Sequence, residues 1–245
     1  MERQGYKIIP ILLLCFNLNV SASYKTDIYS AYVNNKMAKW KELIEAMEAS
    51  KKGDNDFLQE LVNYQYGYIA WCIGNKKNDE ASKYLDQAEK TISILEKDRK
   101  NLSLVNSYKA AFFGYRIGLN KLLAPFIGFK SVNCAKLAIQ LDKENPFGYI
   151  QYANIQYYMP VVFGGSKREA LEYYLIAEKL MEKNINLITD NWNYLCLLIV
   201  IAQTYSYLGE YQLSISFLEK ILKIEPDFGY VKDELYPETV KKMKK

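Results

Sequence analysis

The stretch Ile201–Pro226, IAQTYSYLGEYQLSISFLEKILKIEP, decides the fold that we expect of this chain. Apolar residues recur every three or four positions on both sides of Gly209, which predicts two amphipathic helices joined by a short turn. Small residues at Ala202 and Ser214 allow the paired helices to approach closely. Gly209 ends the first helix and Pro226 stops the second, so the stretch predicts one helical hairpin.

The same organisation continues through the rest of the chain. No stretch shows the sustained alternation of apolar and polar residues that is typical of strands, and most prolines fall where a periodic run ends. No Ser/Gly-rich linker divides the sequence, so we expect a single all-α domain over 24–245. The expected hairpins span about 27–50, 56–97, 103–143, 146–184 and 191–224, and a capping helix follows at 228–243.

The last hairpin resembles a tetratricopeptide repeat in its order of small, aromatic, glycine and proline positions. The matching residues are Ala202, Tyr205, Gly209, Tyr211, Ser214, Leu218, Ile221 and Pro226. Weaker copies keep parts of the pattern at Gly67, Ala70, Ala81, Leu85 and Ala88, at Cys134, Ala138, Leu141 and Pro146, and at Ala153, Ala170, Tyr174 and Ala177. The resemblance covers most of 56–226 and implies a right-handed superhelix of about five stacked hairpins.

The N-terminus, MERQGYKIIPILLLCFNLNVSASY, has the layout of a secretory signal peptide. Two basic residues precede the mostly apolar run Ile8–Val20, and small residues follow it as a cleavage site. We therefore expect residues 1–23 to be removed and the protein to be exported to a bacterial periplasm or envelope. The apolar run is too short to span a bilayer comfortably, so no stable membrane span is expected after cleavage. A lipid anchor on Cys15 is disfavoured because the bulky Leu14 precedes it.

Composition excludes several classes of function. The 245 residues contain no histidine, which removes imidazole-dependent nucleophilic triads and most zinc sites. The net charge is only +4 and the basic residues are scattered, so no nucleic-acid partner is expected. Cys72, Cys134 and Cys196 lie in apolar runs, where buried thiols act as small hydrophobic residues. With no convergent pair of acids either, we expect no metal, no cofactor and no enzymatic activity.

The stretch MPVVFGGSKREA, Met159–Ala170, is open to two interpretations. Paired glycines before Ser and basic residues can cradle a phosphate, or they can form a turn. A similar stretch, Ala124–Ala135, aligns with it without a gap. We therefore predict two equivalent long connections, each joining the helices of one hairpin, with Ser131 and Ser166 as helix caps.

The tetratricopeptide resemblance implies that the first helix of each hairpin lines a concave face that binds peptides or partner proteins. The chain has 22 tyrosines, and several fall at these positions. The candidate binding residues are Tyr68, Trp71, Tyr115, Asn154, Tyr157, Tyr158, Gln203 and Tyr207. Amphipathic aromatic residues and amides suit such a surface, because they give a large contact area at small entropic cost.

We expect a non-catalytic adaptor or scaffold that binds a protein or peptide partner. The alternative is a ligand-binding accessory protein of a periplasmic transport system, with a small solute or lipid in a tyrosine-lined groove. An enclosed apolar pocket favours the alternative, and an open polar groove favours the adaptor.

Overall fold

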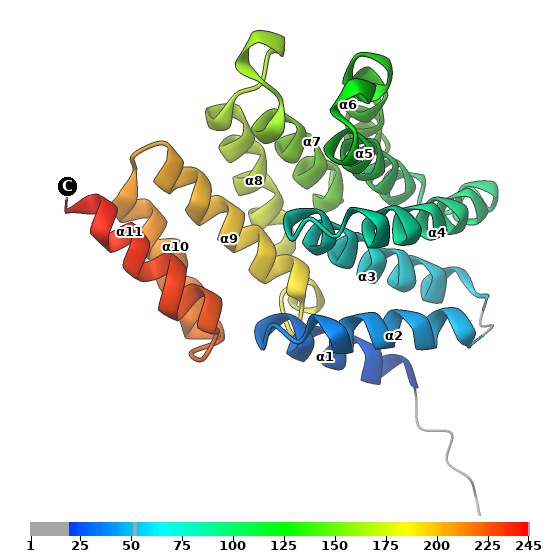
Figure 1. Cartoon of the computed structure of the whole chain (residues 1–245), viewed down its shortest axis with the longest axis horizontal. Coiled ribbons are helices and arrows are strands. Elements are labelled where there is room, and N and C mark those ends of the chain that lie inside the picture. The colour runs from blue at the N-terminus through cyan, green and yellow to red at the C-terminus, as the bar shows by residue number, and fades with distance from the viewer. Residues whose placement is uncertain (1–19, 51–52, 245) are drawn as a thin grey trace, which may run out of the picture.

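The computed structural model describes residues 20–50 and 53–244, with side chains from Tyr24 onward, and it is all-α (Figure 1). Between those limits there is no strand, which confirms the predicted fold class. The predicted signal peptide lies almost wholly outside the described residues. The α-helices are α1 (Val20–Val33), α2 (Met37–Ala49), α3 (Asn55–Gly74), α4 (Asn78–Lys97), α5 (Leu102–Leu119), α6 (Ala124–Leu141), α7 (Pro146–Tyr158), α8 (Lys167–Glu182), α9 (Trp192–Tyr207), α10 (Tyr211–Ile224) and α11 (Tyr236–Met243).

Consecutive helices pack in pairs, and the pairs follow one another around an arch (Figure 1). Small residues hold the members of a pair together. In the α9–α10 pair Ala202 and Ser214 are buried, and the Ser214 hydroxyl donates to the Ala202 carbonyl at 2.7 Å. The turn between these helices contains Gly209 with φ +79°, a left-handed conformation that side chains disfavour. The helical hairpin predicted from Ile201–Pro226 is therefore present.

The two ends of the arch meet. The Tyr29 hydroxyl in α1 donates to Glu225 at 2.6 Å, across 196 residues of sequence. Trp192, at the start of α9, packs edge-on against Trp40 of α2 with ring centroids 5.0 Å apart. A Cβ atom at Gly67 of α3 would lie 2.7 Å from both indole rings, so this glycine leaves the space that the two tryptophans fill. The first hairpins and the α9 hairpin thus share one core.

The predicted equivalence of the two long connections is wrong. The α5–α6 connection is short, and α6 begins at Ala124 with Pro125 in its first turn. Ser131 therefore lies inside the helix, where its hydroxyl donates to the Ala110 carbonyl at 2.7 Å, rather than capping it. The second connection does contain a longer turn, and there the Ser166 hydroxyl accepts from the Glu169 N–H at 3.1 Å as predicted.

One helical stretch, Lys121–Leu141, is long and apolar enough to cross a membrane by length and composition, with a mean hydropathy of 1.3. Only 17% of this window is buried. The stretch nevertheless belongs to a hairpin, because α6 packs along the whole of α5 and Ser131 and Ala135 are buried between them. It therefore contributes an unusually apolar outer surface to the fold.

Candidate ligand-binding site

The eight candidate residues do not share one groove. Tyr68 is only 2% exposed, and its hydroxyl donates to Glu80 at 3.0 Å. Its ring packs edge-on against Tyr84, in the core between α3 and α4. Trp71 stacks on Tyr68 with centroids 5.6 Å apart, and Lys77 lies 4.8 Å over its ring. These two residues therefore pack within the second hairpin. The side chain that α3 turns toward the inside of the arch is Tyr66.

Tyr115 and Asn154 belong to an aromatic cluster that fills the inside of the arch. Tyr66 stacks on Tyr115 at 5.6 Å and also contacts Trp192 at 6.1 Å. Asn154 accepts a hydrogen bond from Tyr174 at 2.6 Å. Burial raises the pKa of Tyr66 to about 12, while Tyr66, Tyr115 and Asn154 each keep part of their surface exposed. The cavity beside it holds only about 40 Å³, enough for little more than a water molecule.

The remaining candidates gather at one place, where α7, α8 and α9 meet. Lys167, at the start of α8, lies with its Nζ 3.5 Å from the ring centroid of Tyr157 and 5.2 Å from that of Tyr207. The Tyr158 centroid is 6.0 Å away. Tyr158 and Tyr207 remain 77% and 67% exposed, so their rings are accessible from solvent. We call Tyr157, Tyr158, Lys167 and Tyr207 the tyrosine–lysine site.

Lys167 has no acidic partner within the described part of the chain. Its Nζ donates to the Tyr157 carbonyl, and no carboxylate there lies within 4.0 Å of it. Burial lowers the pKa of this lysine, because the charged form loses hydration that no counter-charge replaces. The three aromatic rings and the Tyr157 carbonyl partly stabilise the cation, but none of them supplies a negative charge. The site therefore has unused capacity for an anion.

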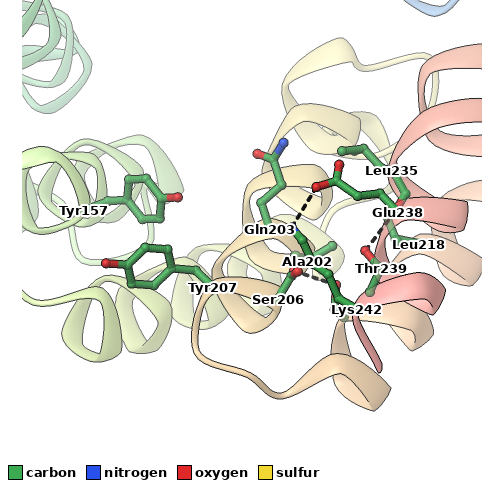
Figure 2. A pocket seen from close by; sticks show the side chains of 11 residues that line it. Tyr157, Ala202, Gln203, Ser206, Tyr207, Leu218, Leu235, Glu238, Thr239 and Lys242 are labelled. Carbon is green, nitrogen blue, oxygen red and sulfur yellow. Dashed lines mark hydrogen bonds and ion pairs between the residues drawn. The ribbon is translucent and has the colours of Figure 1, made fainter. Parts of the chain in front are cut away.

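A pocket of about 300 Å³ adjoins this site (Figure 2). Tyr157 and Tyr207 lie at one side of it, Gln203 lies between, and the C-terminal helix α11 forms the opposite side. The two charged residues that α11 contributes neutralise each other, since Lys242 pairs with Glu238 at 2.7 Å. The pocket is at the lower end of the size range for small-molecule sites.

Sequence reasoning missed Lys167, which completes the site. The signal was present, because the turn that follows Tyr158 is capped at Ser166 and so returns the next residue to the end of α7. No candidate metal centre competes with this site: from 20 to 50 and from 53 to 244, no three Cys, Asp or Glu side chains gather as ligands. Cys72, Cys134 and Cys196, the cysteines that the structure describes, are free and far apart in sequence.

No family model matches the chain, and no curated protein matches it. Among solved structures it is similar to the HusA haemophore from Porphyromonas gingivalis, with a TM-score of 0.62 and 17% sequence identity. The similarity covers 77% of this chain and 94% of that one. At this identity the likeness concerns the fold, a helical arch, and does not carry residues from one protein to the other.

Proposed function

We propose that this chain is an exported, non-catalytic protein that binds a carboxylate-bearing ligand with a large flat apolar body at the tyrosine–lysine site. The observation that carries the proposal is the Lys167 ammonium, which lies among three tyrosine rings without a carboxylate partner in the described residues. A ligand carboxylate would pair with this charge, and charge-assisted hydrogen bonds are among the stronger polar contacts.

The exposed rings define the rest of the ligand. Tyr158 and Tyr207 offer accessible faces beside Lys167, and flat rings stack on such faces at small entropic cost. The fold is similar to that of a haemophore, which makes a porphyrin with carboxylate side chains the first ligand to test. Because the proposed contacts are ring stacking and a carboxylate–lysine pair, with no bond to iron, metal-free porphyrin and haem should bind with similar affinity.

The protein-binding adaptor predicted from the sequence remains the second candidate. That function requires an inner face open enough for an extended segment. Here Tyr66 packs against both Tyr115 and Trp192 inside the arch, and the ends of the arch meet through Tyr29 and Glu225. This filled interior favours a ligand at the rim over a peptide along the inside.

The test is a titration of the purified chain with metal-free protoporphyrin and with haem, followed by absorbance. Lys167→Met removes the charge and keeps most of the side-chain volume. We expect it to weaken binding about tenfold or more, the usual effect of losing one charge-assisted hydrogen bond. Lys179→Met is the matched control, because this lysine is exposed on the same helix and pairs with no acid within the described residues.

The binding should also weaken with rising pH. Since burial lowers the pKa of Lys167, the loss should begin at a lower pH than for an exposed lysine. Equal binding by the Lys167 and Lys179 variants would show that the site is elsewhere. Failure of both porphyrins to bind, together with recovery of one protein partner by cross-linking in native cells, would establish the adaptor instead.

A further inference from the structure

Two neighbouring hairpin turns carry an exposed apolar surface that is separate from the tyrosine–lysine site. The α5–α6 turn and the start of α6 expose Leu122, Phe126 and Phe129, and the α7–α8 turn exposes Val161, Val162 and Phe163. The exposed fractions run from 58% for Phe129 to 84% for Val162. Both turns point toward the same edge of the arch (Figure 1). We call these six residues the tip surface.

The charge around the tip surface has one sign. No Asp or Glu occurs between Asp98 and Asp142, or between Glu144 and Glu169. Lys121 and Lys130 flank the first turn, are exposed, and form no ion pair within the part of the chain that the structure describes. Beside the second turn, Arg168 is already paired with Glu210 at 2.5 Å. The unpaired charge beside the apolar side chains is therefore positive.

From this combination we infer that the tip surface docks the protein on an anionic phospholipid bilayer. Aromatic and aliphatic side chains on protruding turns enter the boundary between headgroups and acyl chains, while flanking lysines reach the anionic headgroups. Protein interfaces differ in both respects, since their cores are depleted of lysine and are packed against a complementary surface. The apolar outer side of Lys121–Leu141, which the fold leaves mostly unburied, extends the same surface.

Docking of this kind goes beyond the proposed function and rests on different residues. Lys167 is the first residue of α8 and directly follows the α7–α8 turn. A protein docked through the tip surface would therefore keep the tyrosine–lysine site close to the lipid surface. The two proposals fail independently, because the tip surface shares no residue with the tyrosine–lysine site.

Vesicle flotation tests the inference with the full chain. The vesicles are phosphatidylcholine alone, or phosphatidylcholine with one part in four phosphatidylglycerol. Phe126→Ser combined with Val162→Ser should lower binding to the anionic vesicles by about tenfold or more for each side chain lost. Lys121→Gln with Lys130→Gln should lower it about fivefold per lysine at low salt and much less at high salt.

Matched controls separate the tips from other apolar residues. Ile94→Ser changes a side chain that is 54% exposed near the C-terminal end of α4, outside the tip surface, and it should leave vesicle binding unchanged. The run Ile8–Val20 can itself enter bilayers, so a site-specific readout is also needed. A fluorophore that responds to polarity is placed on Val162→Cys in a chain that also carries Cys15→Ser, because Cys15 lies in that run. It should shift to shorter wavelength with anionic vesicles, whereas the same label on Ile94→Cys in the Cys15→Ser chain should not.

Three results would overturn the inference. The first is equal flotation of the wild type and the Phe126/Val162 variant, with no spectral shift at position 162. The second is a spectral shift at position 162 that is equally large with and without phosphatidylglycerol. The third is capture of a protein partner through the tips while the intact chain leaves anionic vesicles unbound, which would identify the surface as a protein interface. Far-ultraviolet circular dichroism on every variant checks that the helices remain formed.

Discussion

The replacement of Gly67 by alanine is the most informative perturbation of this fold, because two opposing effects have known sizes. Alanine is more favourable than glycine in a helix interior by about 1 kcal/mol. By helix propensity alone, Gly67→Ala in the middle of α3 would therefore be stabilising. The added methyl group, however, would lie 2.7 Å from Trp192 Cη2 and 2.7 Å from Trp40 Cζ2. Favourable carbon contacts need about 3.5–4.0 Å, so both rings must move by about 1 Å.

The rings have little room to move. Trp40 is 1% exposed and Trp192 is 5% exposed, and Tyr32 packs against both. Overpacking of a buried site costs about 1–3 kcal/mol, and rigid indole rings on both sides place this site toward the upper end. After the helix-propensity gain, we expect a net loss of about 1–2 kcal/mol in the free energy of unfolding. In a domain of this size that lowers the melting temperature by roughly 2–4 °C per kcal/mol.

Thermal and urea unfolding, followed by circular dichroism, measure the effect. Gly114→Ala in α5 is the matched control, because Gly114 is exposed and its added Cβ would meet nothing within 4 Å. The control should be stabilised by about 0.5–1 kcal/mol, so the same substitution should act with opposite signs at the two sites. Combining Gly67→Ala with Trp192→Phe should be less harmful than the sum of the two changes. A Gly67→Ala protein as stable as the wild type would refute the closure of the arch by Trp192.

Three further results follow from the packing and the titrating groups. Ser131→Ala should cost about 1 kcal/mol in unfolding experiments, because it removes the hydrogen bond to the Ala110 carbonyl; an unchanged midpoint would contradict that bond. The hydrogen bond from Lys41 lowers the pKa of Glu80 in the folded protein. The stability that Glu80 contributes is therefore present above the pKa of the unfolded state and is lost as the pH falls through the pKa of the folded state. Between about pH 5 and pH 3, Glu80→Gln should lose less stability than the wild type. Burial raises the pKa of all three described cysteines, that of Cys72 to about 11, so a disulfide reagent should label them slowly in the folded protein and rapidly in urea. Cys72 is buried and the other two are partly buried, so fast labelling at Cys72, Cys134 or Cys196 in the native protein would contradict this reasoning.

The candidate site could be predicted only in part. The tetratricopeptide resemblance implies Tyr157, Tyr158, Gln203 and Tyr207 as binding residues, and all four lie at the tyrosine–lysine site or its pocket. Whether they bind a ligand stays a prediction. Tyr68 and Trp71 were placed on the concave face by the repeat pattern, yet they lie between α3 and α4. A rotation of α3 about its own axis by part of a turn would move Tyr68 and Trp71 from the α3–α4 interface to the concave face. Sequence periodicity does not fix the rotation of a helix that closely.

The sequence by itself determined the helices and their pairing, because helical periodicity, caps and small residues act over a few positions. The end of α9 near Gly209 and the close contact of Ser214 with Ala202 could be predicted in this way. Only the tertiary structure decided that the arch closes, because Trp192 reaches Trp40 and Gly67 across more than a hundred residues. It also decided that Lys167 lies among tyrosines without an acid among the described residues. Such contacts depend on the summed geometry of several hairpins, and no local pattern encodes that sum.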